Sequence, residues 1–331
     1  MHLSARTLNL SLAATAVVLI AFLLLFGDVP MPLRLWIDAV TRPESLPGQI
    51  VWDIRLPRNI TAFLVGAMLG MSGALMQGLL RNPLAEPGIL GVSSGAGLGA
   101  ALAIVVGLGL TPFAVEGFAL AGAVIIAAVL LLFTARFPQR QSLILLGVGL
   151  TALCGALMAL VFNLSPSPVT TAEILGWTMG SVENRTWEDA GLCIIGLGLA
   201  SLLSWKLGRG LRFLTLGDET ARSMGINMAR LGQVIILAAG ILSGLAVAVS
   251  GVIGFVGLAA PHFVRAMGVK DPFRLIWPSA LAGGVMVLIA DGLVRLVPAS
   301  GDIRLGVLTS LIGAPLFAVI AWKSARSWMQ D

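Results

Sequence analysis

The chain has 331 residues, of which 57% are hydrophobic and 11% are charged, and its mean hydropathy is +0.97. A soluble domain carries about 25% charged residues, so this composition excludes a soluble globular protein and predicts an all-α, polytopic membrane protein. The net charge of +5 does not indicate a nucleic-acid partner, because the basic residues stand in short loops between apolar runs and are not interleaved with aromatic residues.

A membrane-spanning helix needs roughly 20 apolar residues, and about ten runs of the sequence approach that length. The predicted membrane helices span residues 8–27, 50–80, 90–108, 112–134, 142–163, 187–207, 230–251, 253–267, 273–297 and 305–323. No clean cleavage site follows the first run, so we interpret it as a membrane helix rather than a signal peptide. The eighth run is too short to span easily, and Pro261 with His262 interrupts it. The stretch from Ser250 to Pro261 is rich in Gly, so we expect it to be partly unwound.

The distribution of charge gives the orientation. If the N-terminus is cytoplasmic, most of the 21 Lys and Arg residues fall in cytoplasmic segments and most of the 16 Asp and Glu residues fall outside. This is the bias that the positive-inside rule describes. We therefore expect a multi-pass protein with both termini in the cytoplasm.

The predicted helices divide evenly between two halves, residues 1–165 and residues 187–331, of one transmembrane domain that covers residues 1–331. Five helices per half is an odd number, so the two halves have inverted topologies if they are repeats. A weak similarity between the halves supports a repeat. Residues 69–78 in the second helix and residues 241–251 in the seventh both carry small residues around a Ser-Gly pair.

The longest charge-dense stretch of the chain covers residues 206–230. Within it, Asp218 to Met224 can form about two helical turns, with Gly217 and Gly225 as helix ends. A helix this polar cannot lie in lipid. Two interpretations stay open: a solvated loop that only connects two membrane helices, or a cytoplasmic element that a partner grips.

Motifs for catalysis are missing from the sequence. It has no Gly-x-x-x-x-Gly-Lys-Ser/Thr phosphate loop, no His-Glu-x-x-His and no Cys-x-x-Cys. We therefore predict no enzymatic activity, no catalytic residue, no metal site and no cofactor, and we interpret Cys154 and Cys193 as small core residues.

Charged residues are also scarce within the predicted membrane helices, although secondary transporters usually carry them. Asp291 and Arg295 are an exception: they are four residues apart and are expected to pair on one helix face. The general scarcity favours transport driven by a separate energy source.

Two further stretches each allow two interpretations. In residues 81–97, Pro83 and Pro87 stop the second predicted helix, and the segment is either a tight membrane turn before close helix packing or a cytoplasmic gate beside a pathway. Arg55 and Arg58 stand at the outer start of that helix, where cations are unfavourable for the helix dipole. They either anchor lipid headgroups or dock acidic groups of an external partner.

Together these stretches resemble the FecCD/BtuC-type permeases of ABC importers for ferric siderophores, haem and cobalamin. The resemblance is specific and runs over most of the chain, because all its motifs occur in order. They are Arg55-Leu-Pro-Arg58, Asn82-Pro-Leu-Ala-Glu-Pro-Gly88, Gly91-Val-Ser-Ser-Gly-Ala96, Leu216-Gly-Asp-Glu-Thr-Ala221, Met224-Gly225, Gly254-Phe-Val-Gly-Leu258, Pro261-His-Phe-Val-Arg265, Ala290-Asp291 with Arg295, and Gly313-Ala-Pro-Leu-Phe317.

The resemblance implies a type II ABC importer permease with about ten transmembrane helices per subunit in two inverted five-helix halves. It implies a homodimer in the bacterial inner membrane, with a central pathway lined largely by helices five and ten. It also implies two ATP-binding cassette ATPase subunits on the cytoplasmic side and a periplasmic or lipid-anchored binding protein outside.

The resemblance assigns roles to residues. The ATPase-coupling residues are Gly217, Asp218, Glu219, Ala221, Arg222 and Gly225. The residues that dock the binding protein are Arg55, Arg58 and Arg295. The residues of the cytoplasmic gate are Asn82, Leu84, Gln139, Arg140 and Gln141. The chain departs from the family where Asp302-Ile-Arg-Leu-Gly306 replaces the frequent Glu-Leu-Pro-x-Gly, because Arg304 adds an outer cation. It also departs at Gln139-Arg-Gln141, where the cobalamin example has small hydroxyl residues.

The expected function is therefore the membrane subunit of a binding-protein-dependent ABC importer for a large iron chelate, driven by ATP hydrolysis on a separate subunit. A ferric siderophore ranks first because of its frequency in the family, while haem and cobalamin stay open. The alternative is an ion-coupled secondary transporter with inverted repeats.

Overall fold

The computed structural model describes residues 5–27, 31–111, 113–137, 139–296 and 303–328, and within them the chain forms helices and no strands. The α-helices are α1 (Ala5–Leu24), α2 (Leu33–Thr41), α3 (Leu46–Gln49), α4 (Leu56–Leu80), α5 (Val92–Val105), α6 (Ala114–Arg136), α7 (Arg140–Asn163), α8 (Pro168–Thr178), α9 (Trp187–Ser204), α10 (Gly208–Leu214), α11 (Asp218–Ser223), α12 (Met228–Ser250), α13 (Val256–Ala266), α14 (Ile276–Leu296) and α15 (Leu305–Trp328). One π-helix, η1 (Ile50–Arg55), and two 3-10 helices, η2 (Pro87–Leu90) and η3 (Trp205–Leu207), lie between them.

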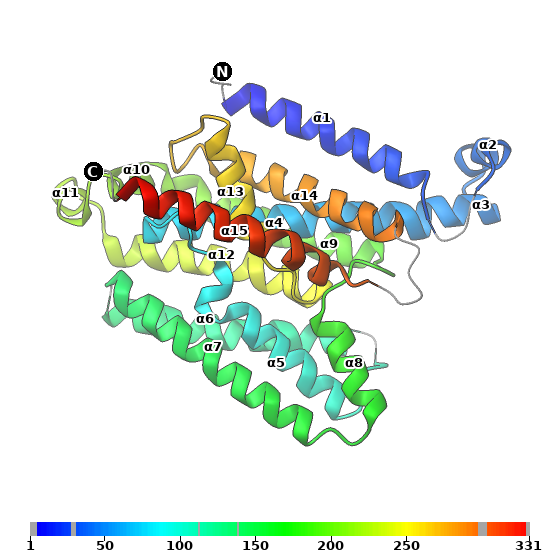
Figure 1. Ribbon diagram of the computed structural model, residues 1–331, viewed down its shortest axis with the longest axis horizontal. Coiled ribbons are helices and arrows are strands. Elements are labelled where there is room, and N and C mark those ends of the chain that lie inside the picture. Colours follow the sequence, from blue (N-terminus) through cyan, green and yellow to red (C-terminus); the bar gives the residue numbers. More distant parts are fainter. Residues whose placement is uncertain (1–4, 28–30, 112, 138, 297–302, 329–331) are drawn as a thin grey trace.

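The long helices lie lengthwise against one another, with α1 along one edge of the bundle and α7 along the opposite edge (Figure 1). Each of the ten predicted membrane segments coincides with a helix, and within the described part of the chain seven helices are long and apolar enough to cross a membrane. The exact count of ten spans stays a prediction, because α5, α13 and α15 are not among these seven. The predicted unwinding between Ser250 and Pro261 is confirmed for residues 251–255, which are not helical. The predicted interruption at Pro261 is wrong, because Pro261 lies inside α13, which runs unbroken from Val256 to Ala266.

The centre of the bundle is α4, which is buried along most of its length. Its glycines let other helices approach at backbone distance: a Cβ added to Gly283 of α14 would lie 2.2 Å from the carbonyl oxygen of Gly66. In the same way, a Cβ added to Gly73 would lie 1.8 Å from the carbonyl oxygen of Gly257 in α13. Small residues at such contacts are how helices pack in lipid, where apolar surface alone does not drive them together.

α4 and α12 occupy corresponding places in the two predicted halves and run in opposite directions (Figure 1). They meet in the core, where the Ser72 hydroxyl donates to the carbonyl of Ala239 over 3.0 Å. The opposite directions agree with inverted halves, and the division into halves stays a prediction.

Sequence reasoning missed four short helices, α2, α3, α8 and α10. The signal for α8 was present: Ser167 caps its first turn by accepting from the N–H of Thr170, and Pro168 is its first residue. A Ser-Pro pair is typical of a helix start, but the surrounding Ser and Pro residues resembled a loop.

Candidate functional site

The candidate coupling element is α11 with its flanking residues, at one end of the bundle, which we call the inner end. Gly217 (φ +107°) precedes α11 and Gly225 (φ +82°) follows it, so both predicted helix ends are confirmed. Ala221 is fully buried, whereas Glu219 and Arg222 are exposed.

Two large apolar side chains flank α11 and are open to the surroundings. Leu216 is 62% exposed and Met224 is 57% exposed.

One salt bridge from α11 and one from the neighbouring α10 tie this end of the chain to the rest of the bundle. Arg81, which follows α4, donates to the carbonyl of Leu214 over 3.3 Å and lies 3.5 Å from the carboxylate of Asp218. Arg212 in α10 donates to Asp271, in the link between α13 and α14, over 2.7 Å. A displacement of α11 would therefore act on both α4 and that link.

Asp271 also organises its own turn by accepting from the backbone N–H groups of Phe273 (2.9 Å) and Arg274 (3.0 Å). Burial alone would raise the pKa of Asp271, but the hydrogen bonds from Arg274 and from the Arg212 guanidinium outweigh it and hold the pKa below its usual value. The carboxylate is therefore held in its charged form beside Arg212.

The loop between α4 and α5 begins with two of the residues assigned to the cytoplasmic gate, Asn82 and Leu84. The side-chain oxygen of Asn82 accepts from the N–H of Leu84 over 2.9 Å, which fixes a tight turn. Further along, the Glu86 carboxylate accepts from the N–H of Phe255 over 3.0 Å. The loop is thereby anchored to the start of α13.

The other gate residues lie at the start of α7. Gln139 and Gln141 are exposed, and Arg140 is the first residue of the helix. Among the described side chains, no hydrogen bond or ion pair joins Gln139 or Gln141 to Asn82 or Leu84. The loop does touch α7 at its other end, where a Cβ on Gly91 would lie 3.2 Å from the backbone nitrogen of Thr151.

Phe255 connects the break between α12 and α13 to α15. It adopts a left-handed conformation with φ +66°, which is unusual for a bulky residue. A Cβ added to Gly313 of α15 would lie 2.4 Å from the Cβ of Phe255, so the phenylalanine fills a notch that only glycine leaves open. Cavities of about 220 and 620 Å³ lie beside this contact, so α15 rests on Phe255 with free space around it.

The three arginines assigned to docking gather at the opposite, outer end of the bundle. Arg58 donates twice to one oxygen of Asp291, at 2.8 and 3.2 Å, and Arg295 pairs with its other oxygen. The predicted Asp291–Arg295 pair is therefore confirmed, and Arg58 joins it from α4. Arg55 donates to the carbonyl of Leu24 at the end of α1.

These arginines are turned into the chain rather than outward. Arg55 is 4% exposed, and the exposed fractions of the Arg295 and Arg58 side chains are 3% and 15%. Their assignment as docking residues stays a prediction. In this conformation they join the ends of α1, α4 and α14, and a partner would reach Arg58 before the other two.

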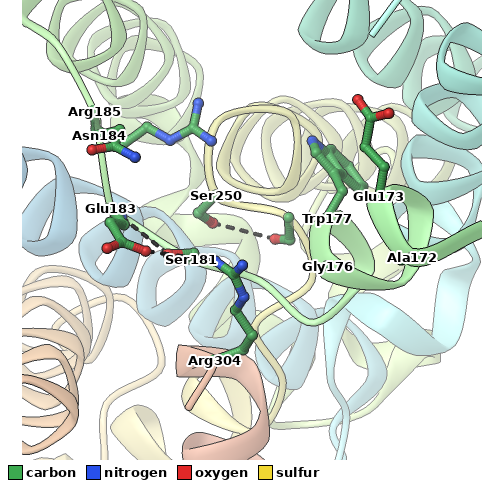
Figure 2. A pocket seen from close by; sticks show the side chains of 11 residues that line it. Ala172, Glu173, Gly176, Trp177, Ser181, Glu183, Asn184, Arg185, Ser250 and Arg304 are labelled. Carbon is green, nitrogen blue, oxygen red and sulfur yellow. Dashed lines mark hydrogen bonds and ion pairs between the residues drawn. The ribbon is translucent and has the colours of Figure 1, made fainter. Parts of the chain in front are cut away.

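A charged cavity of about 380 Å³ also opens at the outer end, where α8, the segment after it, the end of α12 and Arg304 meet. Figure 2 shows Arg304 facing Glu183, while Glu173 and Trp177 project from α8 on the other side. The Arg304 guanidinium lies 3.6 Å from Glu183. Arg304, where the sequence departs from the family pattern, therefore forms an ion pair beside the start of α15. Residue 302 of the same motif lies outside the described residues.

Sequence reasoning missed Glu86 and Phe255 as contacts, although both lie within quoted motifs. It also missed Asn59, which joins the outer network by accepting from Arg295. No local signal marks them, because each contact joins positions more than 160 residues apart.

Comparisons with known proteins agree over most of the chain. The sequence profile of the FecCD transport family matches residues 15–323. The vitamin B12 import system permease protein BtuC of Salmonella typhi is 41% identical over 286 residues, which cover 85% of this chain and 86% of that protein. The protein of the same name from Citrobacter koseri is 41% identical over 284 residues, with the same coverage.

Two solved structures are similar as well. A metal-chelate type ABC transporter in an inward-facing conformation superposes with a TM-score of 0.84 and 31% identity, over 97% of this chain and 100% of that chain. PsaBC from Streptococcus pneumoniae superposes with a TM-score of 0.57 and 18% identity, over 86% of this chain and 94% of that chain, which shows a likeness of fold alone.

Proposed function

Because the chain belongs to the FecCD transport family, we propose that it is the membrane permease of a bacterial inner-membrane ABC importer whose cargo is a corrinoid of the vitamin B12 type. The observation that carries this proposal is the 41% identity to vitamin B12 permeases across 85% of the chain. The ferric siderophore, ranked first from the sequence on frequency alone, becomes the second candidate. The similar metal-chelate transporter keeps that candidate in the test.

The proposed energy source is an ATPase subunit that binds α11 on each half of a homodimer. The exposed side chains of Leu216 and Met224 support this contact, since the buried core of a protein interface is more apolar than the surface around it. The charged residues Glu219 and Arg222 beside them would orient the partner. Closure of the ATPases would then displace α11.

The displacement has a physical route into the bundle. Arg81 carries it from α11 to α4 and the loop that follows, while the Arg212–Asp271 pair carries it to the link before α14. On the outer side, a binding protein would deliver the cargo, with Arg58 as its most accessible docking cation. The permease alternates between outward-open and inward-open states as the two subunits rock.

The test is uptake into proteoliposomes that contain the permease, its ATPase and an internalised ATP supply, with the binding protein outside. Radiolabelled cyanocobalamin and a radiolabelled ferric hydroxamate are offered in parallel. We expect ATP-dependent accumulation of cyanocobalamin. Uptake of the hydroxamate alone would move the cargo to the second candidate, and uptake that persists without the ATPase, driven by an ion gradient, would overturn the importer itself.

A further inference from the structure

A further cavity, at the inner end of the bundle, has a composition that coupling to an ATPase does not require. It measures about 720 Å³ and lies between the end of α9, α10 and the start of α12. Its polar rim includes Lys206, Arg209 and Arg230, and its floor includes the apolar side chains of Leu203 and Phe213. No carboxylate is among the described residues that line it.

The three cations of this rim differ from their neighbours in the same stretch. Arg212 and Arg81 are engaged with Asp271 and Asp218, whereas Lys206, Arg209 and Arg230 form no ion pair with any carboxylate of the described residues. All three side chains are exposed. Three positive charges therefore converge on one cavity without a counter-charge among the described residues, and an anion bound there would relieve their mutual repulsion.

The cavity continues into the apolar surface of α9. Leu202, which lines it, is 73% exposed. Leu199 and Ile195 follow at helical spacing on the same face and are 48% and 59% exposed. This stripe lies on one of the helices long and apolar enough to cross the membrane. It presents a strip to hydrocarbon directly below the cationic rim.

The depth of the cavity in the membrane is marked by Trp205, which is 80% exposed and adjoins Lys206. Tryptophan is enriched at the headgroup level of membranes, where its ring is buried in lipid and its N–H meets water. The cations of the rim, the indole of Trp205 and the apolar strip of α9 thus follow one another in the order of the headgroup, interface and hydrocarbon layers of one leaflet.

We propose that this cavity binds one anionic phospholipid, with the phosphate held by Lys206, Arg209 and Arg230 and an acyl chain lying along Leu202, Leu199 and Ile195. Basic pockets between membrane helices on the cytoplasmic side are suited to anionic headgroups. A carboxylate of a partner protein would also pair with the cations of the rim, but it would leave the apolar strip on α9 without a partner.

The site adjoins the coupling element directly. Met224 and Gly225, at the end of α11, line the same cavity. A bound lipid would therefore hold the end of α11 and the start of α12 against α10, and the fraction of anionic lipid in the membrane would set how firmly α11 transmits motion.

The direct test uses the purified permease alone, so its outcome does not depend on the proposed function. The parent protein in detergent is incubated with equal amounts of phosphatidylglycerol and phosphatidylcholine, and bound lipid is counted by native mass spectrometry. We expect phosphatidylglycerol to be retained in preference. The variant Lys206→Gln/Arg209→Gln/Arg230→Gln should lower that preference by about tenfold or more, since each cation near an anionic surface contributes on the order of a fivefold change.

The matched control is Arg136→Gln/Lys270→Gln/Arg274→Gln, which removes three exposed cations from the same end of the bundle and outside the cavity. It should change the lipid preference by less than about twofold. A second variant, Leu202→Glu, keeps every cation and should weaken retention by placing an acid where the acyl chain enters.

Equal loss of phosphatidylglycerol in the variant and the control would show general charge attraction and overturn the site. Unchanged retention in the variant would also overturn it. If that variant instead failed to assemble with the ATPase while keeping its lipid, the three cations would belong to the ATPase contact.

Discussion

The carboxylate of Glu86 accepts a hydrogen bond of 3.0 Å from the backbone N–H of Phe255, 169 positions further along the chain. This contact joins the loop after α4 to the start of α13. Phe255 in turn fills the notch at Gly313 of α15, and Arg81 at the start of the loop pairs with Asp218 of α11. A chain of contacts thus runs from α11 to α15 through Glu86.

Replacing Glu86 tests whether this chain of contacts transmits force. Glu86→Ala removes the acceptor and should lower the cargo transported per ATP hydrolysed by about threefold to tenfold, the effect of one hydrogen bond. Glu86→Gln keeps an oxygen acceptor of the same reach and should restore most of that ratio. Both quantities are measured on the same proteoliposomes of the full complex.

The control for Glu86 is Glu44→Gln, an exposed carboxylate that should leave the ratio unchanged. A merely structural role for Glu86 would lower the yield of assembled complex but not the ratio in what assembles. Wild-type coupling in Glu86→Ala would break the proposed link while leaving the importer proposal intact.

Asp291 should be more important for stability than any surface acid. It is the carboxylate that faces both Arg58 and Arg295, and its side chain is 2% exposed. Removing one partner of a buried ion pair costs about 3–5 kcal/mol, so Asp291→Ala should markedly lower the midpoint of thermal unfolding in detergent. Asp53→Ala, at an exposed acid near the same end, should shift the midpoint little, and similar shifts for the two would contradict this account.

The close backbone contact of α4 and α14 gives a second stability prediction. Gly283→Ala would place a Cβ 2.2 Å from the carbonyl oxygen of Gly66, and the backbones must separate to admit it. Overpacking of this kind costs about 1–3 kcal/mol or more. Gly198→Ala is the matched control because nothing lies within 4 Å of its added methyl group, and it should be neutral or slightly stabilising. Thermal unfolding of both variants in the same detergent measures the difference.

Much of the fold could be predicted, because a membrane helix is recognised in the sequence as a long apolar run. The bounds of α11 were predictable too, since Gly217 and Gly225 mark the ends of a short polar helix. Hydropathy carries no information on how helices pair, so the close contacts of Gly66 with Gly283 and of Gly73 with Gly257 needed the structure.

The outer arginines show where sequence reasoning fell short. The sequence places Arg55 and Arg58 at the outer start of a helix, where they would anchor lipid headgroups or dock an external partner. Their partners are the carbonyl of Leu24 and the carboxylate of Asp291, which lie on other helices. Only the pair four residues apart, Asp291 and Arg295, was within reach of a local rule.

The contact between Arg81 and Asp218 provides the last prediction. The two groups are 3.5 Å apart with exposed fractions of 40% and 36%, and a pair this exposed contributes only about 0–1 kcal/mol to stability. Asp218→Lys should therefore leave the permease folded. It should nevertheless uncouple ATP hydrolysis from uptake, by about fivefold or more, because repulsion from Arg81 separates α11 from the end of α4.

A charge exchange separates this explanation from a direct contact with the ATPase. The double variant Arg81→Glu/Asp218→Lys restores opposite charges across the same gap, so uptake per ATP should recover toward the parent value if the pair transmits motion. If Asp218 acts only by touching the ATPase, Arg81→Glu cannot compensate and the double variant should be as uncoupled as Asp218→Lys alone. Normal uptake in Asp218→Lys would remove Asp218 from the coupling element altogether.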